Sequence, residues 1–139
     1  MATAAIANGG TLFKPQVVNR IIDADIKTIL SIEPEISNQD FIEAADLAVV
    51  RKGMRQAVFD GSAWALADLP VDAAGKTGTA QYGIGDQTHA WFTAFAPYQQ
   101  PTIALAVIIE AGGEGSIVAG PVVKEVFEHY FNHLAESDD

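Results

Sequence analysis

The chain is 139 residues long, which is enough for one domain with a buried core. It carries 18 acidic and 8 basic residues, giving a formal net charge of −10, and the basic residues are scattered along the sequence. Nucleic acids and anionic membrane surfaces bind clustered positive charge, so neither is an expected partner. The absence of cysteine excludes disulfides, thiol catalysis and thiolate metal sites.

Hydrophobic residues make up 49% of the chain and charged residues 19%, proportions that are typical of a globular protein. No basic segment followed by an apolar stretch opens the sequence, and no apolar run approaches the ~18 residues that are needed to cross a bilayer. We therefore expect neither a signal peptide nor a membrane anchor within this chain.

The N-terminal third is predicted to contain a helix and a hairpin. Met1–Ala7 is rich in alanine and runs into Asn8-Gly9-Gly10, residues that tolerate the positive φ found at helix ends. A chain that begins within a helix is expected to belong to a longer protein. Further on, the β-branched runs Val17–Ile22 and Ile26–Leu30 are separated by Asp23-Ala24-Asp25, a pattern that predicts a β-hairpin.

A long helix is predicted from about Gln39 to Phe59. Ser37 followed by Asp40 resembles a capping box, the arrangement of side chains that satisfies the first backbone N–H groups of a helix. Apolar residues then recur at helical spacing as far as Asp60-Gly61, where we expect the helix to end.

Three extended segments follow Pro70. They are Ala73–Tyr82, His89–Ala96 and Thr102–Glu110, and each is bounded by glycine or proline. Their short spacing favours antiparallel neighbours. Within the third segment, Ile103–Ile109 is apolar at successive positions, which predicts a central strand with helices on both faces of the sheet.

A C-terminal helix is predicted from an apolar stripe that includes Val118, Val122, Val126 and Tyr130. Pro121 is expected in its first turn, where a missing N–H breaks no intrahelical hydrogen bond. The predicted fold class is α+β: an antiparallel sheet of three strands packed against a C-terminal helix, with an N-terminal hairpin and a long helix.

The run Lys76-Thr77-Gly78-Thr79 lies in the first of the three predicted strands. Its lysine supplies a positive charge, its threonine hydroxyls donate hydrogen bonds, and its glycine allows a ligand to approach the backbone closely. Because side chains alternate along a strand, Lys76 and Gly78 should share one face while Thr77 and Thr79 share the other. These residue types suit the binding of an anion at a sheet edge.

A Lys-Thr-Gly triplet is one of three motifs in penicilloyl-serine enzymes, alongside a Ser-x-x-Lys box with the nucleophile and a Ser-x-Asn type box. Neither of these boxes occurs in this chain. The serines that we tested for them are Ser31, Ser37, Ser62, Ser116 and Ser137. The sequence therefore carries part of a catalytic site without its nucleophile.

Over nearly its whole length the chain resembles the C-terminal half of the transpeptidase domain of class B penicillin-binding proteins. The segments that carry the resemblance follow in the family's order: Met1–Ala4, Ala7–Pro15, Ala74–Gln81, His89–Pro97, Ile103–Glu110 and Gly112–Gly115. The resemblance implies that residues 1–139 form the C-terminal portion of a β-lactamase-like domain. The family's sheet has five strands, so the other strands are expected to lie outside this sequence.

The resemblance also implies a role for each residue of the motif. In that family the lysine-threonine strand borders the acyl-transfer cleft, so Lys76 would tune the electrostatics of the second box. Thr77, Gly78 and Thr79 would bind the carboxylate of a peptidoglycan stem peptide or a β-lactam. The backbone N–H of Thr79 would be one oxyanion-hole donor. Because the nucleophilic serine is absent and the covalent route needs it, we expect the chain alone to be inactive.

The parent protein implied by the resemblance is a serine-type D-Ala-D-Ala transpeptidase of cell-wall synthesis, periplasmic and anchored in the inner membrane. Two alternatives stay open: a non-catalytic module that binds a peptide or a partner strand, and a degenerate remnant without activity. The sheet edge that the missing strands would leave open also predicts self-association.

Other polar motifs are interpreted as structural. His129 and His133 have the spacing of a helical zinc pair, but the intervening glutamate is absent and no third ligand is evident. Gly112–Gly115 lacks the Lys-Ser/Thr ending of a phosphate loop. His89 is expected at a strand end and Trp91 against a helix. We expect no metal and no cofactor.

Overall fold

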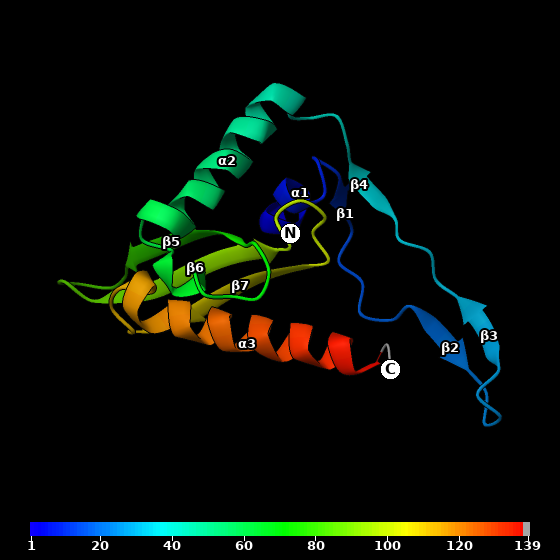
Figure 1. The fold of residues 1–139 in the computed structure, drawn as a ribbon. Helices are drawn as coiled ribbons and strands as arrows, with labels where there is room; N and C mark the ends of the chain where they lie inside the picture. Colours follow the sequence, from blue (N-terminus) through cyan, green and yellow to red (C-terminus); the bar gives the residue numbers. More distant parts are fainter. Residues whose placement is uncertain (138–139) are drawn as a thin grey trace.

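The computed structural model describes residues 1–137 of the chain, with side chains as far as residue 133. Its elements are α1 (Ala2–Ala7), β1 (Leu12–Phe13), β2 (Arg20–Ile22), β3 (Thr28–Ser31), β4 (Ile36–Asn38), α2 (Ala44–Asp60), the 3₁₀ turn η1 (Trp64–Leu66), β5 (Ala74–Gln81), β6 (Thr88–Ala96), β7 (Ile103–Ile109) and α3 (Gly115–Ser137). We call residues 12–38, which hold β1 to β4, the arm, and the remaining elements the body. The arm projects to one side of the body (Figure 1).

The body is built on an antiparallel sheet with the strand order β5-β6-β7, which confirms the three predicted strands. The prediction that Ile103–Ile109 is central is wrong for the sheet of the described residues, in which β6 is central and β7 lies at an edge. Even so, cover by helices explains why β7 is apolar on both faces. It contacts both α1 and α3, and the predicted cover by helices is therefore confirmed.

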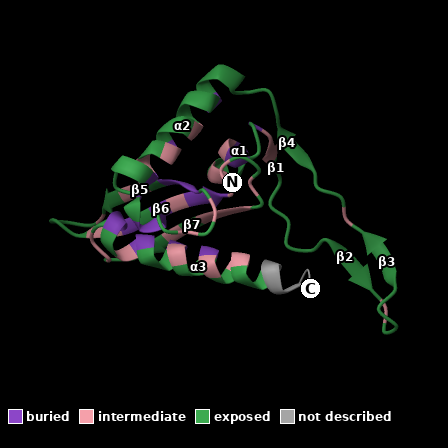
Figure 2. Ribbon diagram, in the orientation of Figure 1, coloured by how far each residue is buried: buried purple, intermediate pink, exposed green. Residues whose placement is uncertain are grey.

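One face of the sheet packs against α3 and η1. Phe92 from β6, Phe127 from α3 and Leu66 from η1 are almost completely buried there, and the small side chains of β6 on this face let the helix approach closely. Figure 2 shows the buried residues concentrated between the sheet and the first half of α3. Removing each large apolar side chain from water stabilises the fold by about 1.5–3 kcal/mol.

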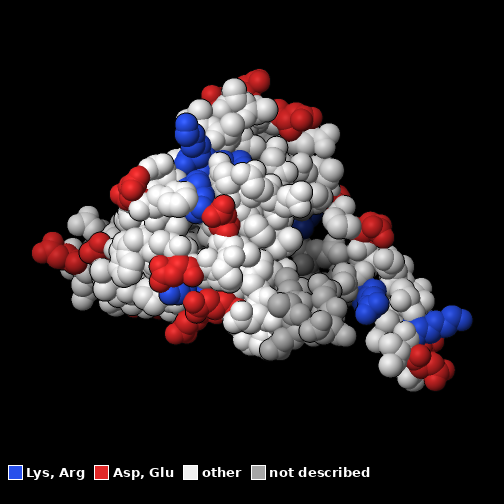
Figure 3. All heavy atoms as spheres, viewed as in Figure 1, with Lys and Arg blue, Asp and Glu red and all other residues white. Residues whose placement is uncertain are grey.

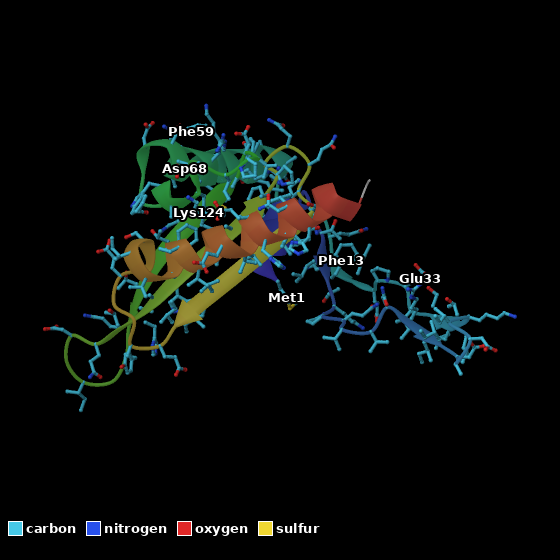
Figure 4. All side chains as sticks on the ribbon, turned by 60° about the horizontal axis from the view of Figure 1, so that its bottom comes forward. Met1, Phe13, Glu33, Phe59, Asp68 and Lys124 are labelled. Atoms are coloured by element: carbon cyan, nitrogen blue, oxygen red, sulfur yellow. The ribbon has the colours of Figure 1, made fainter. Side chains whose placement is uncertain are left out.

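An ion pair also joins α3 to the segment that follows η1. The Lys124 ammonium lies 3.1 Å from a carboxylate oxygen of Asp68 and 3.7 Å from Glu128 on its own helix. Figure 4 labels Lys124 and Asp68 on these two elements. The hydrogen bond between Lys124 and Asp68 is the largest cause of the raised pKa of Lys124.

Pro121 lies in the interior of α3 rather than in its first turn, so that prediction is wrong. The helix begins at Gly115, and the turns before the proline are held by packing, because Ser116 and Ala119 are buried. Proline removes one hydrogen bond to the preceding turn, here to the carbonyl of Ile117. Tertiary packing on the sheet offsets this local cost.

The second face of the sheet carries α1 and α2. Phe95 is fully buried on this face, and the guanidinium of Arg51 lies over its ring at 4.9 Å. Arg51 also donates hydrogen bonds to the carbonyls of Ile6 (3.0 Å) and Ala7 at the end of α1, and to that of Tyr98 (2.6 Å). The last carbonyls of a helix have no partner within the helix, so one side chain fixes α1, α2 and the β6–β7 loop together.

The long helix α2 begins at Ala44, so the predicted start at Gln39 is wrong. Ser37 lies in β4, which pairs with β1, and Asp40 adopts a φ of 57°. Strand pairing followed by a left-handed residue therefore replaces the expected capping box. The helix ends at Asp60, one residue past the predicted end.

The arm contains the predicted hairpin, formed by β2 and β3 with Ile21 opposite Leu30. Its turn is closed by the Asp23 carboxylate, which accepts hydrogen bonds from the N–H groups of Asp25 (3.0 Å) and Lys27 (2.8 Å). Every residue of both strands is exposed, and Figure 2 shows the hairpin almost entirely in the exposed colour. No second layer of the described chain covers it.

Charge is spread over the molecule. On the face shown in Figure 3, acidic and basic side chains both occur on the body and on the arm. Within residues 1–137, none of the helices combines the length and the apolar character needed to cross a bilayer.

Candidate functional site at the β5 edge

The motif Lys76-Thr77-Gly78-Thr79 occupies the middle of β5, an edge strand of the described sheet. Lys76 stands opposite Thr93 and Gly78 opposite Trp91 on β6. Lys76 and Thr79 are exposed, while Thr77 and Gly78 are partly buried. The structure thus brings all the predicted site residues to one open edge.

Lys76 and Thr77 point to opposite faces of the sheet, as strand alternation predicts. On the first face, Lys76 and Thr93 line a mostly apolar hollow of about 440 Å³ at α1 and α2. The other lining residues are Ala2, Thr3, Ile6, Val50, Gly53 and Met54. This face offers one cation beside an apolar wall, an arrangement suited to a ligand with an anionic end.

On the opposite face, the hydroxyl oxygens of Thr77 and Ser62 lie 2.6 Å apart. Ser62 belongs to the turn between α2 and η1, and the next residue, Ala63, would lie 3.2 Å from a Cβ placed at Gly75. Glycine at this position therefore lets the turn lie directly on β5. Both contacts fall on the face that alternation assigns to residues 75, 77 and 79.

The backbone of β5 presents polar groups to its open edge. The Lys76 ammonium donates a hydrogen bond to the carbonyl of Thr77, so this carbonyl faces away from β6. In an antiparallel strand the N–H and C=O of one residue point to the same side, and residues two apart repeat that direction. The N–H of Thr79 therefore faces the same open edge as the Thr77 carbonyl.

The first residue of α3 lies directly against the motif. A Cβ added to Gly115 would come within 2.4 Å of the Gly78 carbonyl oxygen and 2.2 Å of the Trp91 carbonyl oxygen. Only glycine allows this approach, which presses the start of α3 onto the strand pair. The structural interpretation of Gly112–Gly115 omitted this contact, because no local pattern indicates which strand a loop glycine touches.

His89 and Trp91 take no part in a polar cluster with the motif. The Nδ1 of His89 accepts a hydrogen bond from the N–H of Ala111 (3.1 Å), and its ring stacks on Tyr82 with centroids 4.0 Å apart. These contacts agree with the structural interpretation of His89 near a strand end. Trp91 is 38% exposed and lies outside the buried core.

The two histidines of α3 are neighbours, with ring centroids 4.0 Å apart. The Nδ1 of His133 lies 2.9 Å from the carbonyl oxygen of His129. In the part of the chain that the structure describes, no group of three or more His, Asp or Glu side chains is arranged to hold a metal ion.

Sequence reasoning missed Ser62 and Arg51. Ser62 was tested only as the start of a Ser-x-x-Lys or a Ser-x-Asn box, whereas its contact with Thr77 joins residues 15 positions apart. Arg51 looks like any charged residue on an amphipathic helix. The run Gly61-Ser62-Ala63 could have indicated the role of Ser62, since a turn of small residues between a helix and a strand allows close packing.

The comparison with protein families assigns this fold and motif to one class. The model for the penicillin binding protein transpeptidase domain matches residues 1–128. The chain therefore belongs to the penicillin-binding protein transpeptidase family, as its sequence resemblance implied.

Named relatives are peptidoglycan D,D-transpeptidases. The chain is 34% identical over 132 residues to the peptidoglycan D,D-transpeptidase PbpA of Mycolicibacterium smegmatis, a match that covers 86% of this chain and 26% of the relative. It is 30% identical over 150 residues to the peptidoglycan D,D-transpeptidase MrdA of Haemophilus influenzae, covering 94% of this chain and 23% of the relative. The chain thus spans about a quarter of the length of these relatives and covers part of the transpeptidase domain.

The fold is also found in solved structures. The imipenem acyl-enzyme complex of penicillin-binding protein A from M. tuberculosis matches with a TM-score of 0.79 and 30% identity, over 93% of this chain and 29% of that one. A protein similar to this chain thus forms an acyl-enzyme complex with imipenem.

Proposed function

We propose that this chain forms the sheet side of the active-site cleft of a peptidoglycan D,D-transpeptidase, as the C-terminal portion of its transpeptidase domain. The observation that carries the proposal is the motif Lys76-Thr77-Gly78-Thr79, which lies on an open edge strand in a member of this family. The substrate class is a peptidoglycan stem peptide that ends in D-Ala-D-Ala, and β-lactams are the corresponding inhibitors.

Each motif residue has a role that its geometry supports. Lys76 contributes positive charge near the reacting groups, and its exposed position beside the hollow supports contact with a ligand. The hydroxyls of Thr77 and Thr79 bind the ligand carboxylate, and Gly78 allows the ligand to lie along the strand. The N–H of Thr79, at the open edge, donates to the oxyanion of the tetrahedral intermediate.

The acyl-transfer step also needs a serine nucleophile, and no serine of these 139 residues lies in a Ser-x-x-Lys box. The loss of one oxyanion-hole donor from an intact site raises the barrier by about 2.7–4 kcal/mol, whereas loss of the nucleophile removes the covalent route. The chain alone therefore binds the ligand without being acylated. As part of a cell-wall enzyme, it acts outside the cytoplasm.

An open strand edge also favours self-association. Within the described residues β7 has a neighbour only on the β6 side, and Ile108 on this strand is exposed. Apolar edge strands pair with other chains, and a charged side chain on the edge opposes such pairing. Sedimentation velocity of the wild-type chain should show concentration-dependent dimers that Ile108→Lys reduces, and a wild-type monomer at all concentrations would contradict this part of the proposal.

The proposed function is tested with two ligands. The purified chain is incubated with a fluorescent penicillin and measured by intact mass, and its binding to an N-acetylated D-Ala-D-Ala dipeptide is measured by isothermal titration calorimetry. We expect saturable binding of the dipeptide without a covalent adduct. The variant Thr77→Val, which keeps the shape of the side chain but removes the hydroxyl, should weaken binding.

Each other outcome has a defined meaning. A covalent penicillin adduct would contradict the predicted lack of a nucleophile and would show acylation by this chain. The absence of both adduct and dipeptide binding would contradict the proposal and favour an inactive remnant. If Thr77→Val leaves dipeptide binding unchanged, the binding site does not lie at β5.

A further inference from the structure

Ser62 contacts the motif strand through its hydroxyl, although it belongs to none of the motifs of the family. Its Oγ lies 2.6 Å from the Oγ1 of Thr77, a short hydrogen bond between two hydroxyls. Either oxygen could be the donor, so this contact alone leaves the direction of the hydrogen bond open.

The turn that carries Ser62 is held on both sides. The N–H of Ala63 donates to the carbonyl of Ala57 in the last turns of α2 at 2.9 Å, and the side chain of Ala63 is fully buried. A Cβ added to Gly61 would lie 2.9 Å from the Cα of Ala57, so the turn passes very close to the helix. Ser62 is thus fixed between α2 and β5 by its neighbours rather than by its own exposed side chain.

When an anion is bound, the number of available hydroxyl protons decides the direction of the hydrogen bond between Ser62 and Thr77. The Thr77 hydroxyl has one proton, and a carboxylate accepts hydrogen bonds but donates none. If Thr77 donated to Ser62, it would present only lone pairs to the carboxylate. If Ser62 donates to Thr77, the Thr77 proton is free for the ligand. The two successive hydrogen bonds, from Ser62 to Thr77 and from Thr77 to the carboxylate, then strengthen each other.

We propose that Ser62 is a positioning residue for carboxylate binding, donating a hydrogen bond to Thr77 so that Thr77 donates its own proton to the ligand. The inference rests on the proposed function, in which Thr77 binds the carboxylate end of the ligand. Ser62 itself does not contact the ligand. Its effect is specific for a negatively charged acceptor, because charge-assisted hydrogen bonds are the stronger ones.

The test measures the affinity of the chain for an N-acetylated D-Ala-D-Ala dipeptide and for the same dipeptide with a C-terminal amide, by isothermal titration calorimetry. Ser62→Ala should weaken binding of the free acid about three- to tenfold, the effect of one lost hydrogen bond, and change binding of the amide less than about twofold. Ser62→Thr, which restores a hydroxyl, should return most of the affinity. Ser31→Ala removes an exposed hydroxyl in the arm and should have no effect. Circular dichroism checks that each variant is folded.

The outcomes separate this inference from the proposed function. Wild-type binding with no loss in Ser62→Ala overturns the inference and leaves the proposed function intact. Equal losses for the acid and the amide, or no recovery in Ser62→Thr, also overturn it, because they indicate a general distortion of the turn. If the wild-type chain binds neither dipeptide, the proposed function fails and the inference fails with it.

Discussion

The body and the arm contain similar β-branched strands but differ in what covers them. In the body, β7 carries isoleucine, leucine and valine side chains that are mostly half-buried, because α1 and α3 contact it from the two faces. In the arm, Ile21 and Ile29 are 47% and 66% exposed, although β2 and β3 pair in an antiparallel hairpin. Local sequence and pairing are enough to form strands, while burial needs a second layer.

This difference indicates where a binding site can be precise. An isolated two-stranded hairpin is only marginally stable in water, whereas a sheet packed by helices holds its side chains in fixed positions. The motif residues lie in the body, where Gly75 and Gly115 allow a turn and a helix to press on β5 from neighbouring elements. We therefore expect stability and ligand binding to depend on the body and to be insensitive to the arm.

The largest difference should come from deleting a buried ring. Phe92→Ala should lower the free energy of unfolding by about 3–5 kcal/mol, because it opens a cavity between β6 and α3. Ile29→Ala in the arm removes an exposed side chain and should change it by less than about 0.5 kcal/mol. Urea denaturation followed by circular dichroism measures both. Comparable losses in the two variants would show that the arm is packed as firmly as the body.

A second comparison concerns charged side chains. Arg51→Ala leaves the carbonyls of Ile6, Ala7 and Tyr98 without their donor and should cost about 2–4 kcal/mol. Lys14→Ala removes the exposed ion pair with Glu35 in the arm, and pairs of this kind contribute about 0–1 kcal/mol. The same denaturation experiment applies. A small effect of Arg51→Ala would mean that α1 is not fixed through this side chain.

The third comparison is between two glycines of the body. Gly115→Ala forces a Cβ against two carbonyl oxygens of β5 and β6 and should cost about 1–3 kcal/mol, with amide shifts at Gly78 and Thr79 in NMR spectra. Gly53→Ala in α2 meets no atom within 4 Å and should stabilise the helix by about 0.5–1 kcal/mol. Equal effects at both positions would contradict the close contact between α3 and the motif strand.

The smallest effect is expected from the ion pair of α3. The hydrogen bond with Asp68 raises the pKa of Lys124 above its ordinary value of 10.5. A cation whose pKa rises on folding stabilises the fold below its unfolded pKa, and this contribution disappears as the pH rises through the folded pKa. The stability difference between the wild type and Asp68→Asn should therefore be constant between about pH 6 and pH 10 and should disappear as the pH rises through the folded pKa of Lys124. A difference that grows with pH in this range would contradict the sign of the shift.

Most secondary structure could be predicted from the sequence, because hydrophobic periodicity and turn residues act locally. The β5–β7 strands and the hairpin were predicted in this way. The start of α2 could not be predicted, because Ser37 and Asp40 have the residue types of a capping box but belong to a strand and a left-handed turn. Pro121 was misplaced for a similar reason, since packing of the first turns of α3 outweighs a local preference.

The candidate site could be predicted only as far as its motif. The residues Lys76 to Thr79 are adjacent in sequence, and the family resemblance indicated their edge position. Ser62 and Gly115 reach the same strand from distant segments, through contacts that depend on how α2 and α3 pack. No spacing in the sequence encodes such contacts, and physical reasoning finds them only once the fold is known.

The central claim is that the motif strand of the body binds the carboxylate end of the ligand while the arm takes no part. The most direct test is an NMR titration of the ¹⁵N-labelled chain with the N-acetylated D-Ala-D-Ala dipeptide, using the amides of β2 and β3 as an internal reference. We predict saturable shifts at residues 76–79 and at Ser62, with unchanged amides in the hairpin. Shifts confined to the arm, or none at residues 76–79 at saturating dipeptide, would contradict the claim.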